Sequence, residues 1–203
     1  ETWPFPVLYR VVAGASPTRA VEQNPRALLA PFIEAGQDLV DQGCSGIVTT
    51  CGFLTLLQDE LRAALDVPVA TSSLMQFPMV QALLPTNRHP GILTISRPAL
   101  TPAHLQAVGV PADAPVVGTE GGRSFTRDIL NDQPSLNLED CRLDMLDAAQ
   151  ALINTDSQVG AIILECTNMA PYAAEIAEET GLPVFSVITL VHWLHAGLMP
   201  QRF

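Results

Sequence analysis

Two stretches of the chain share one pattern of apolar and polar residues. In AIILECTNM (161–169), a run of apolar residues leads almost directly into Cys166. In GIVTTCGFL (46–54), 115 positions earlier, Cys51 occupies the matching place. A short apolar run that ends in polar residues is typical of a buried parallel strand. The pattern therefore predicts two strands that each bring a cysteine to the edge of a sheet.

The similarity extends beyond the two cysteines. Each cysteine is followed 17 residues later by a proline between apolar residues, Pro68 in the first case and Pro183 in the second. A segment of helical length separates cysteine from proline both times. We interpret this as an internal duplication, in which each copy consists of a strand, a cysteine, a helix and a second strand.

Further strands and helices are predicted on either side of the two cysteine stretches. The strands are 7–14, 68–71, 91–96, 114–120 and 184–189, and the helices are 25–43, 73–84, 98–108, 139–154 and 190–198. Pro78 should kink or divide its helix. In helix 139–154 the apolar face should contain Leu143, Leu146 and Ile153, and 118–124 should form a turn. Alternating helices and strands favour a parallel sheet with right-handed crossovers.

The fold class predicted from this order is α/β, with two pseudo-symmetric Rossmann-like lobes, mainly parallel sheets flanked by helices, and an active site in the cleft between the lobes. A chain of 203 residues suits two half-size lobes. We expect residues 1–73 to form the first lobe and 74–189 the second, with 190–203 packing back on the first. The counterpart of strand 91–96 would precede residue 1, so we expect an additional N-terminal strand and loop in the native protein.

The amino-acid composition argues against several classes of partner and of catalytic chemistry. The formal charge of −11 argues against nucleic acid and against an anionic membrane surface as partners. All ten basic residues are arginine. Without lysine there is no Schiff base to pyridoxal phosphate and no phosphate-loop lysine. No apolar stretch is long enough to span a membrane.

The four cysteines do not form a recognisable scaffold or zinc motif. A reducing, cytoplasmic compartment is the simpler expectation. Cys44 and Cys141 lie outside the repeated motif, and we interpret both as structural. His192 and His195 could share one helix face, but without a partnering cluster we expect no metal.

Ligands of open parallel sheets bind at the carboxyl ends of the strands, where both motif cysteines are predicted to lie. A helix should start after each cysteine, and its unpaired amides should lower the thiol's pKa from about 8.5 and attract carboxylates. Glu165 should point away from Cys166 along a regular strand. We expect Glu165 to pair with an arginine or to modulate the thiol, with a structural role first.

Two thiols that bracket one cleft suit a reaction with a base and an acid on opposite faces of one carbon. One thiolate removes a proton while the opposing thiol delivers another, so stereoinversion is the natural outcome. Backbone amides and hydroxyls would stabilise the charge that develops on the substrate carboxylate.

With these two cysteine motifs, the chain resembles the aspartate/glutamate racemase superfamily, which includes hydantoin racemases, maleate isomerases and arylmalonate decarboxylases. The resemblance implies a cofactor-independent, two-thiol enzyme with facing α/β lobes that acts on a small carboxylate or a hydantoin, and a homodimer. By position, Cys51 and Cys166 would be the acid and base. The implied substrate-binding residues are Thr50, Gly52, Phe53, Ser96, Thr167 and Asn168.

Several functions remain open at this point. Gly52 and Phe53 stand where aspartate racemases have Asn and Thr, which favours a more apolar ligand. A racemase or epimerase is the first hypothesis, because both cysteines are present. A decarboxylase or cis-trans isomerase is the second, and a non-catalytic small-acid binding protein is the third. A redox pair is disfavoured, since opposed acid and base thiols should lie too far apart to bridge.

Overall fold

The computed structural model describes residues 2–23 and 25–202 and is an α/β protein with parallel sheets. In these residues, one sheet pairs β1 with β2, and the other has the order β4-β3-β5-β6. The strands are β1 (Ile47–Val48), β2 (Val69–Ala70), β3 (His89–Thr94), β4 (Val116–Gly118), β5 (Val159–Leu164) and β6 (Val184–Phe185). Every strand pair is parallel, which confirms the predicted fold class.

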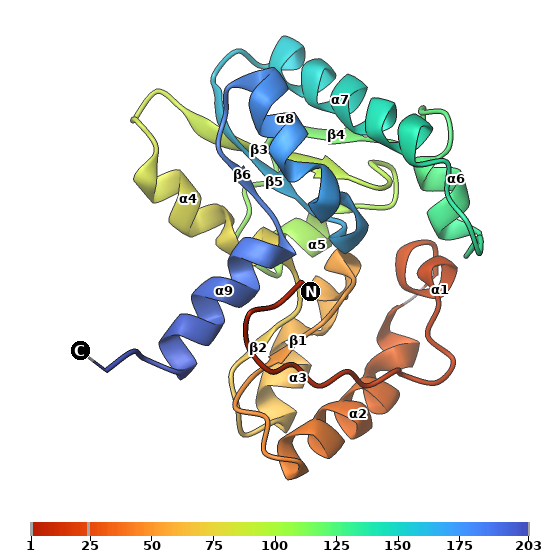
Figure 1. Ribbon diagram of the computed structural model, residues 1–203, viewed down its shortest axis with the longest axis vertical. Helices are drawn as coiled ribbons and strands as arrows, with labels where there is room; N and C mark the ends of the chain where they lie inside the picture. The colour runs from red at the N-terminus through yellow and green to blue at the C-terminus, as the bar shows by residue number, and fades with distance from the viewer. Residues whose placement is uncertain (1, 24, 203) are drawn as a thin grey trace.

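Helices flank both sheets, with the larger sheet at the top of Figure 1 and the smaller sheet at the bottom. The α-helices are α1 (Pro17–Val21), α2 (Leu29–Asp41), α3 (Gln58–Ala64), α4 (Phe77–Leu83), α5 (Pro102–Gln106), α6 (Phe125–Leu130), α7 (Leu138–Thr155), α8 (Ala173–Thr180) and α9 (Val187–Leu198). Short 3₁₀ helices are η1 (Pro25–Leu28), η2 (Gly52–Leu57), η3 (Ser73–Gln76) and η4 (Thr167–Tyr172). None of the helices in the described ranges is long and apolar enough to cross a bilayer.

The duplication predicted from the sequence is present in the strand register. Ile47 pairs with Val69 in the smaller sheet, and Ile162 pairs with Val184 in the larger one, 115 residues later in both strands. In each copy the cysteine is the residue before a 3₁₀ helix, η2 or η4, and an α-helix and a parallel strand follow. The two copies therefore present their cysteines in the same local setting.

Each sheet has its own hydrophobic core. The larger core surrounds β3 and β5, and the smaller core surrounds β1 and β2. Cys51 packs against both cores, so the first motif lies where the two meet. Full burial of a large apolar side chain contributes about 1.5–3 kcal/mol. The two loops that carry the cysteines are thus anchored by well-packed strands.

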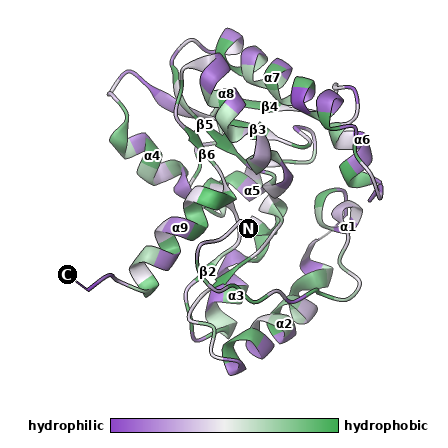
Figure 2. Cartoon of the chain, viewed as in Figure 1, coloured by the Kyte–Doolittle hydropathy of each residue, from purple (hydrophilic) through white to green (hydrophobic). Residues whose placement is uncertain are grey.

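The long helix α7 covers the larger sheet with one face, and its hydrophobic and hydrophilic residues alternate along its length (Figure 2). Its buried face contains Cys141, Met145, Ala149 and Leu152, at helical spacing. The predicted face is displaced from this one, because Leu146 and Ile153 are only partly buried at its edge. The prediction relied on the large apolar side chains, and therefore missed that the smaller Cys141 and Ala149 lie on the buried face.

The predicted strand at 7–14 is wrong. This segment is extended but is not part of either sheet, and its apolar side chains face solvent, with Val11 89% exposed. Just before it, the Phe5 ring stacks on His195 of α9, with ring centroids 3.6 Å apart. The apolar, β-branched composition of 7–14 favours a strand, but a strand also needs a neighbour for its backbone hydrogen bonds.

Other element boundaries differ from the predictions for local reasons. The predicted strand 184–189 is cut to two residues, because Ser186 caps α9 in a capping box with Thr189. The helix predicted at 98–108 is shortened to α5, and α6 was not predicted. Pro78 lies in the first turn of α4, just after η3, and so divides the predicted helix.

Candidate active site

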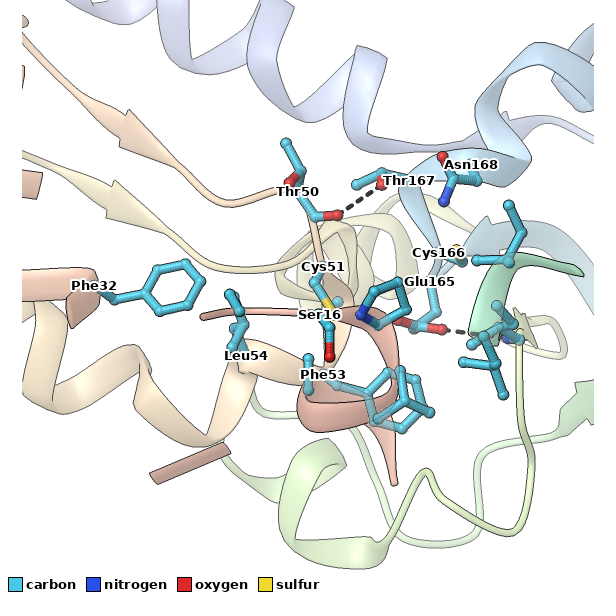
Figure 3. Close-up of a pocket in the computed structure, with 18 residues that line it drawn as sticks. Ser16, Phe32, Thr50, Cys51, Phe53, Leu54, Glu165, Cys166, Thr167 and Asn168 are labelled. Atoms are coloured by element: carbon cyan, nitrogen blue, oxygen red, sulfur yellow. Dashed lines mark hydrogen bonds between the residues drawn. The ribbon is translucent and has the colours of Figure 1, made fainter. Parts of the chain in front are cut away.

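A cavity of about 310 Å³ lies where the two cysteine loops meet. Its walls come from both motifs, from α1 and α6, and from single residues of α2 and of the loop after β3. The lining residues are Ala15, Ser16, Pro17, Ala20, Val21, Phe32, Thr50, Cys51, Gly52, Phe53, Leu54, Ile95, Ile129, Leu130, Glu165, Cys166, Thr167 and Asn168. Figure 3 shows residues of both motifs gathered around this space.

Both motif cysteines line the cavity as free thiols. Cys51 follows β1 and is half-buried, whereas Cys166 follows β5 and is 8% exposed. After burial and the charge of Glu165, Cys51 also contributes to the raised pKa of Cys166, as expected of two side chains that line one cavity. The arrangement presents two thiols to one bound molecule.

The pKa of each thiol moves in the direction opposite to the prediction. Burial raises the pKa of Cys51 to about 12, and the negative charge of Glu165 adds to this effect. Backbone N–H groups of Phe53 and Leu54 favour the thiolate, as expected at a helix start, but they are outweighed. Burial likewise raises the pKa of Cys166 well above its usual range. Removal from water disfavours the charged form more than these amides favour it.

Glu165 lines the cavity, although its sequence position suggested a structural role first. Its carboxyl Oε2 accepts hydrogen bonds from Thr94 Oγ1 at 2.9 Å and from the Ile95 N–H at 3.4 Å. The expected arginine partner is absent from the hydrogen bonds and ion pairs of Glu165 among the described residues. Burial raises the pKa of this carboxyl to about 7.

Glu165 modulates both thiols, as one of the expected alternatives had it, since its charge raises their pKa values. The strand geometry explains why it nevertheless lines the cavity and does not point away from it. β5 ends at Leu164, so Glu165 lies beyond the last regular residue and its side chain need not follow the strand's alternation. A charged residue directly after a buried apolar run was the signal that could have identified it. Such a residue lies at the carboxyl end of the sheet, where ligands bind.

Thr50 and Thr167 connect the two loops that carry the cysteines. The Thr167 hydroxyl donates a 2.7 Å hydrogen bond to the carbonyl of Thr50, drawn as a dashed line in Figure 3. Asn168 donates toward the Cys166 sulfur from its backbone and side chain, which favours the thiolate. These hydrogen bonds hold polar groups from both motifs beside the thiols.

The other predicted substrate-binding residues differ in their access to the cavity. Gly52 and Phe53 line it, although the Phe53 ring is buried and packs edge-on against His104 at 5.2 Å. Ser96 is not part of the cavity wall formed by the described residues, where Ile95 stands instead. The role of Ser96 in substrate binding stays a prediction, and the preceding residue lines the cavity in its place.

The outer wall of the cavity is mainly apolar and was not predicted. Ala20 and Val21 of α1 face Ile129 and Leu130 near the end of α6 across this region. The Thr18 hydroxyl donates a 2.8 Å hydrogen bond to the Leu130 carbonyl, which fastens α1 to α6. These helices are short, so their sequences carry little periodic signal.

The charge of the cavity is carried by one residue. Among the lining residues in the described part of the chain, Glu165 alone has an ionisable carboxyl or a basic group. No cluster of three or more histidine, cysteine, aspartate or glutamate residues suited to a metal ion occurs in residues 2–23 and 25–202. The available chemistry is therefore that of two thiols, one carboxyl, hydroxyls and backbone amides.

Comparison with known proteins gives relatives in sequence and in structure. No family model matches the chain. Dimethylsulfoniopropionate lyase 7 of Emiliania huxleyi (strain CCMP1516) is 29% identical over 204 residues, covering 96% of this chain and 60% of the relative. Dimethylsulfoniopropionate lyase 6 of the same strain is 30% identical, covering 96% and 53%. A dimethylsulfoniopropionate lyase of Durusdinium sp. clade D is 27% identical, covering 98% and 68%. The chain thus spans 53–68% of the length of these relatives.

Solved structures agree on the fold. Allantoin racemase from Klebsiella pneumoniae superposes with a TM-score of 0.58 at 22% identity, covering 83% of this chain and 66% of that one. Unliganded arylmalonate decarboxylase gives 0.56 at 15% identity, with 88% and 79% covered. Glutamate racemase from Francisella tularensis subsp. tularensis SCHU S4 gives 0.52 at 16% identity, with 89% and 69% covered. The chain has the two-lobe fold of the Asp/Glu/hydantoin racemase superfamily.

Proposed function

We propose that this chain, which has the fold of the Asp/Glu/hydantoin racemase superfamily, removes the proton next to the carboxylate of a small acid. We further propose that the reaction is β-elimination from dimethylsulfoniopropionate or a close analogue. The observation that carries the proposal is the meeting of two thiols and one carboxyl in a single cavity at the ends of β1 and β5. The sequence relatives named as dimethylsulfoniopropionate lyases support the choice of substrate.

In the proposed mechanism, Cys51 is the base. It is more exposed to the cavity than Cys166, and two backbone N–H groups favour its thiolate. The thiolate takes the α-proton, and the electron pair of that C–H bond forms the Cα–Cβ double bond. The Cβ–S bond breaks at the same time, and its electron pair leaves with sulfur. The products are acrylate and neutral dimethyl sulfide, and the proton on Cys51 then passes to water.

The substrate carboxylate needs hydrogen-bond donors as charge develops on it. The start of η4 offers the backbone N–H of Thr167 beside Cys166, and the side-chain NH₂ of Asn168 has a second N–H besides the one it donates toward the Cys166 sulfur. Donors fixed in advance around a developing negative charge lower the barrier, often by several kcal/mol in total. We therefore assign the carboxylate end of the substrate to this side of the cavity.

A cationic substrate would also favour thiolate formation. In the empty cavity, burial and the charge of Glu165 keep Cys51 protonated. A sulfonium group bound beside Glu165 replaces part of the lost solvation and offsets that charge. The opposite charge lowers the thiol's pKa and brings it closer to neutral.

Racemisation or epimerisation of a small carboxylate or a hydantoin is the second candidate. It is favoured by the presence of both thiols in one cavity, which permits a base on one face of the carbon and an acid on the other. The two candidates make different demands. Inversion needs both thiols, whereas elimination of a neutral leaving group needs one base.

One experiment separates the candidates. The purified chain is incubated in deuterated water with dimethylsulfoniopropionate, aspartate, glutamate or allantoin, and NMR follows acrylate formation and loss of the α-proton. We expect acrylate from dimethylsulfoniopropionate, a loss of at least about a hundredfold in Cys51→Ser, and a smaller loss in Cys166→Ser. Cys44→Ser, in the smaller core and away from the cavity, is the matched control.

Other results would point elsewhere. Exchange and inversion of an amino acid or allantoin that disappear in both cysteine variants would favour the racemase. Turnover that survives in Cys51→Ser and in Cys166→Ser would exclude both thiol mechanisms.

A further inference from the structure

We propose that Glu165 is the cation-binding group of the cavity, and that the site selects carboxylates that carry a permanent positive charge, sulfonium or quaternary ammonium, close to the carboxylate. The inference rests on the proposed function for the carboxylate end of the ligand. The cationic end is argued from the side chains around Glu165.

The first observation is the uneven use of the two carboxyl oxygens. Oε2 of Glu165 accepts both hydrogen bonds, from Thr94 and from Ile95. Within the described residues, no donor is bonded to Oε1. Two donors from β3 and the residue after it thus fix the carboxyl. Oε1 lies against the backbone of Gly52 on one side and, among the described residues, accepts no hydrogen bond there, so it is the oxygen that can interact with a ligand.

The second observation is the absence of a compensating charge. A carboxyl that is 1% exposed is costly to ionise unless it is paired. Neither an arginine nor a histidine is among the described residues that line the cavity. A ligand that brings its own cation would complete the pair.

The third observation is the character of the surrounding wall. Val21, Ile95 and Leu130 offer methyl groups, and Phe32 contributes an aromatic ring. Such surfaces suit the methyl groups of a trimethylammonium or dimethylsulfonium cation, which cannot donate a conventional N–H hydrogen bond. An aromatic face attracts a quaternary cation through its π electrons, and the apolar side chains accommodate the methyl groups.

The same features disfavour a dicarboxylate. Aspartate or glutamate would bring a second carboxylate into the cavity. Once Glu165 is ionised, that carboxylate would lie near a group of the same charge. Like charges at short range in a partly dehydrated site cost more than they do in water. Specificity would then come from repulsion of the wrong ligand as well as from attraction of the right one.

The proposed pairing predicts a pH dependence. Burial raises the pKa of Glu165 to about 7, so its ionised fraction rises about tenfold between about pH 6 and about pH 8. The titratable groups beside it are the thiols of Cys51 and Cys166, whose pKa values are raised and which stay protonated over this range. Thr94 and Ile95, which bond its carboxyl, do not titrate. The affinity for a cationic ligand should therefore increase with pH.

Two ligands of the same shape test the proposal by calorimetry. 3-(Trimethylammonio)propionate carries the cation, and 4,4-dimethylpentanoate replaces its nitrogen with carbon. For the wild-type chain at about pH 8, we expect the cationic ligand to bind at least about tenfold more tightly, and this preference to shrink at about pH 6. Glu165→Gln keeps an oxygen that can accept from Thr94 and Ile95, and should abolish the preference. Glu178→Gln, an exposed change of the same charge on α8, should leave it intact.

Three results would overturn the proposal: equal binding of the two ligands, an undiminished preference in Glu165→Gln, or no binding of the cationic ligand. If Glu165→Gln fails to fold, the wild-type chain still tests the proposal. A preference for the cationic ligand that does not increase from about pH 6 to about pH 8 contradicts the role of this carboxyl. The readout is binding and requires no turnover. A Glu165-dependent preference without acrylate formation would leave the inference standing and refute the proposed elimination.

Discussion

The carboxyl of Glu165 lies directly against the α-carbon of Gly52. A β-carbon built on Gly52 would stand 2.2 Å from Oε1 of Glu165 and 2.6 Å from its backbone carbonyl oxygen. These distances are far shorter than any van der Waals contact. The two loops that carry the cysteines therefore approach each other at a point where only glycine fits.

Gly52→Ala should disturb both the stability and the cavity. The new methyl group must push the Glu165 loop away, and overpacking of this kind costs about 1–3 kcal/mol. We expect urea denaturation to show a loss of this size, together with a large fall in turnover. Gly197→Ala is the control, because a β-carbon at that helical position meets no atom within 4 Å. Equal behaviour of the two variants would contradict the close contact.

Glu165 should make the stability of the fold depend on pH. Burial raises its pKa from the ordinary 4.5 of a glutamate to about 7, so the folded state holds this proton more tightly than the unfolded state does. The resulting stabilisation is complete below about pH 4.5 and is lost as pH rises through about 7, for a total of about 3 kcal/mol.

Glu165→Gln should remove this component. Denaturation midpoints compared at about pH 5 and about pH 8 should therefore fall less in the variant than in the wild type. Glu178→Gln should show the wild-type slope. An unchanged slope in Glu165→Gln would mean that the carboxyl is not effectively buried in solution.

The hydrogen bond from Thr167 to Thr50 should matter more for turnover than for stability. Thr167→Val keeps the shape of the side chain and removes the donor, and such a bond contributes about 0.5–1.5 kcal/mol. We expect a small change in unfolding free energy and a severalfold loss of activity as the two loops loosen. Thr155→Val, which removes a 2.8 Å bond to Ala151 at the far end of α7, should change stability alone.

The resting thiols should react slowly with iodoacetamide. Alkylation requires the thiolate, and burial with the charge of Glu165 raises the pKa of Cys51 to about 12. Glu165→Gln removes the charge and should accelerate alkylation of Cys51, as followed by mass spectrometry of its peptide near pH 8. Rapid labelling of Cys51 in the wild-type chain would show that the thiol is better solvated than its surroundings indicate.

The repeat and most of the sheet could be predicted because their signals are local and regular. Apolar runs before Cys51 and Cys166, and the prolines 17 residues later, define strands whose register then matches at 115 residues. The segment 7–14 carries the same kind of signal without becoming a strand. Composition reports what a segment favours, whereas strand formation also depends on a neighbour far away in the chain.

Only some of the residues that line the cavity could be predicted from the sequence. Residues adjacent to the cysteines could be named, because chain neighbours stay close in space. Other lining residues depend on how separate elements pack against each other. These are Ile95, which lines the cavity in place of Ser96, and the residues of α1 and α6. The raised thiol pKa values depend on the depth of burial, a property of the whole fold.

The matched register also reveals where the two copies of the duplication have diverged. Thr50 occupies the position before the first cysteine and Glu165 the position before the second. A carboxyl before one cysteine and a hydroxyl before the other make the surroundings of the two thiols unequal. The two thiols therefore need not do the same work, and each copy of the duplication is free to specialise.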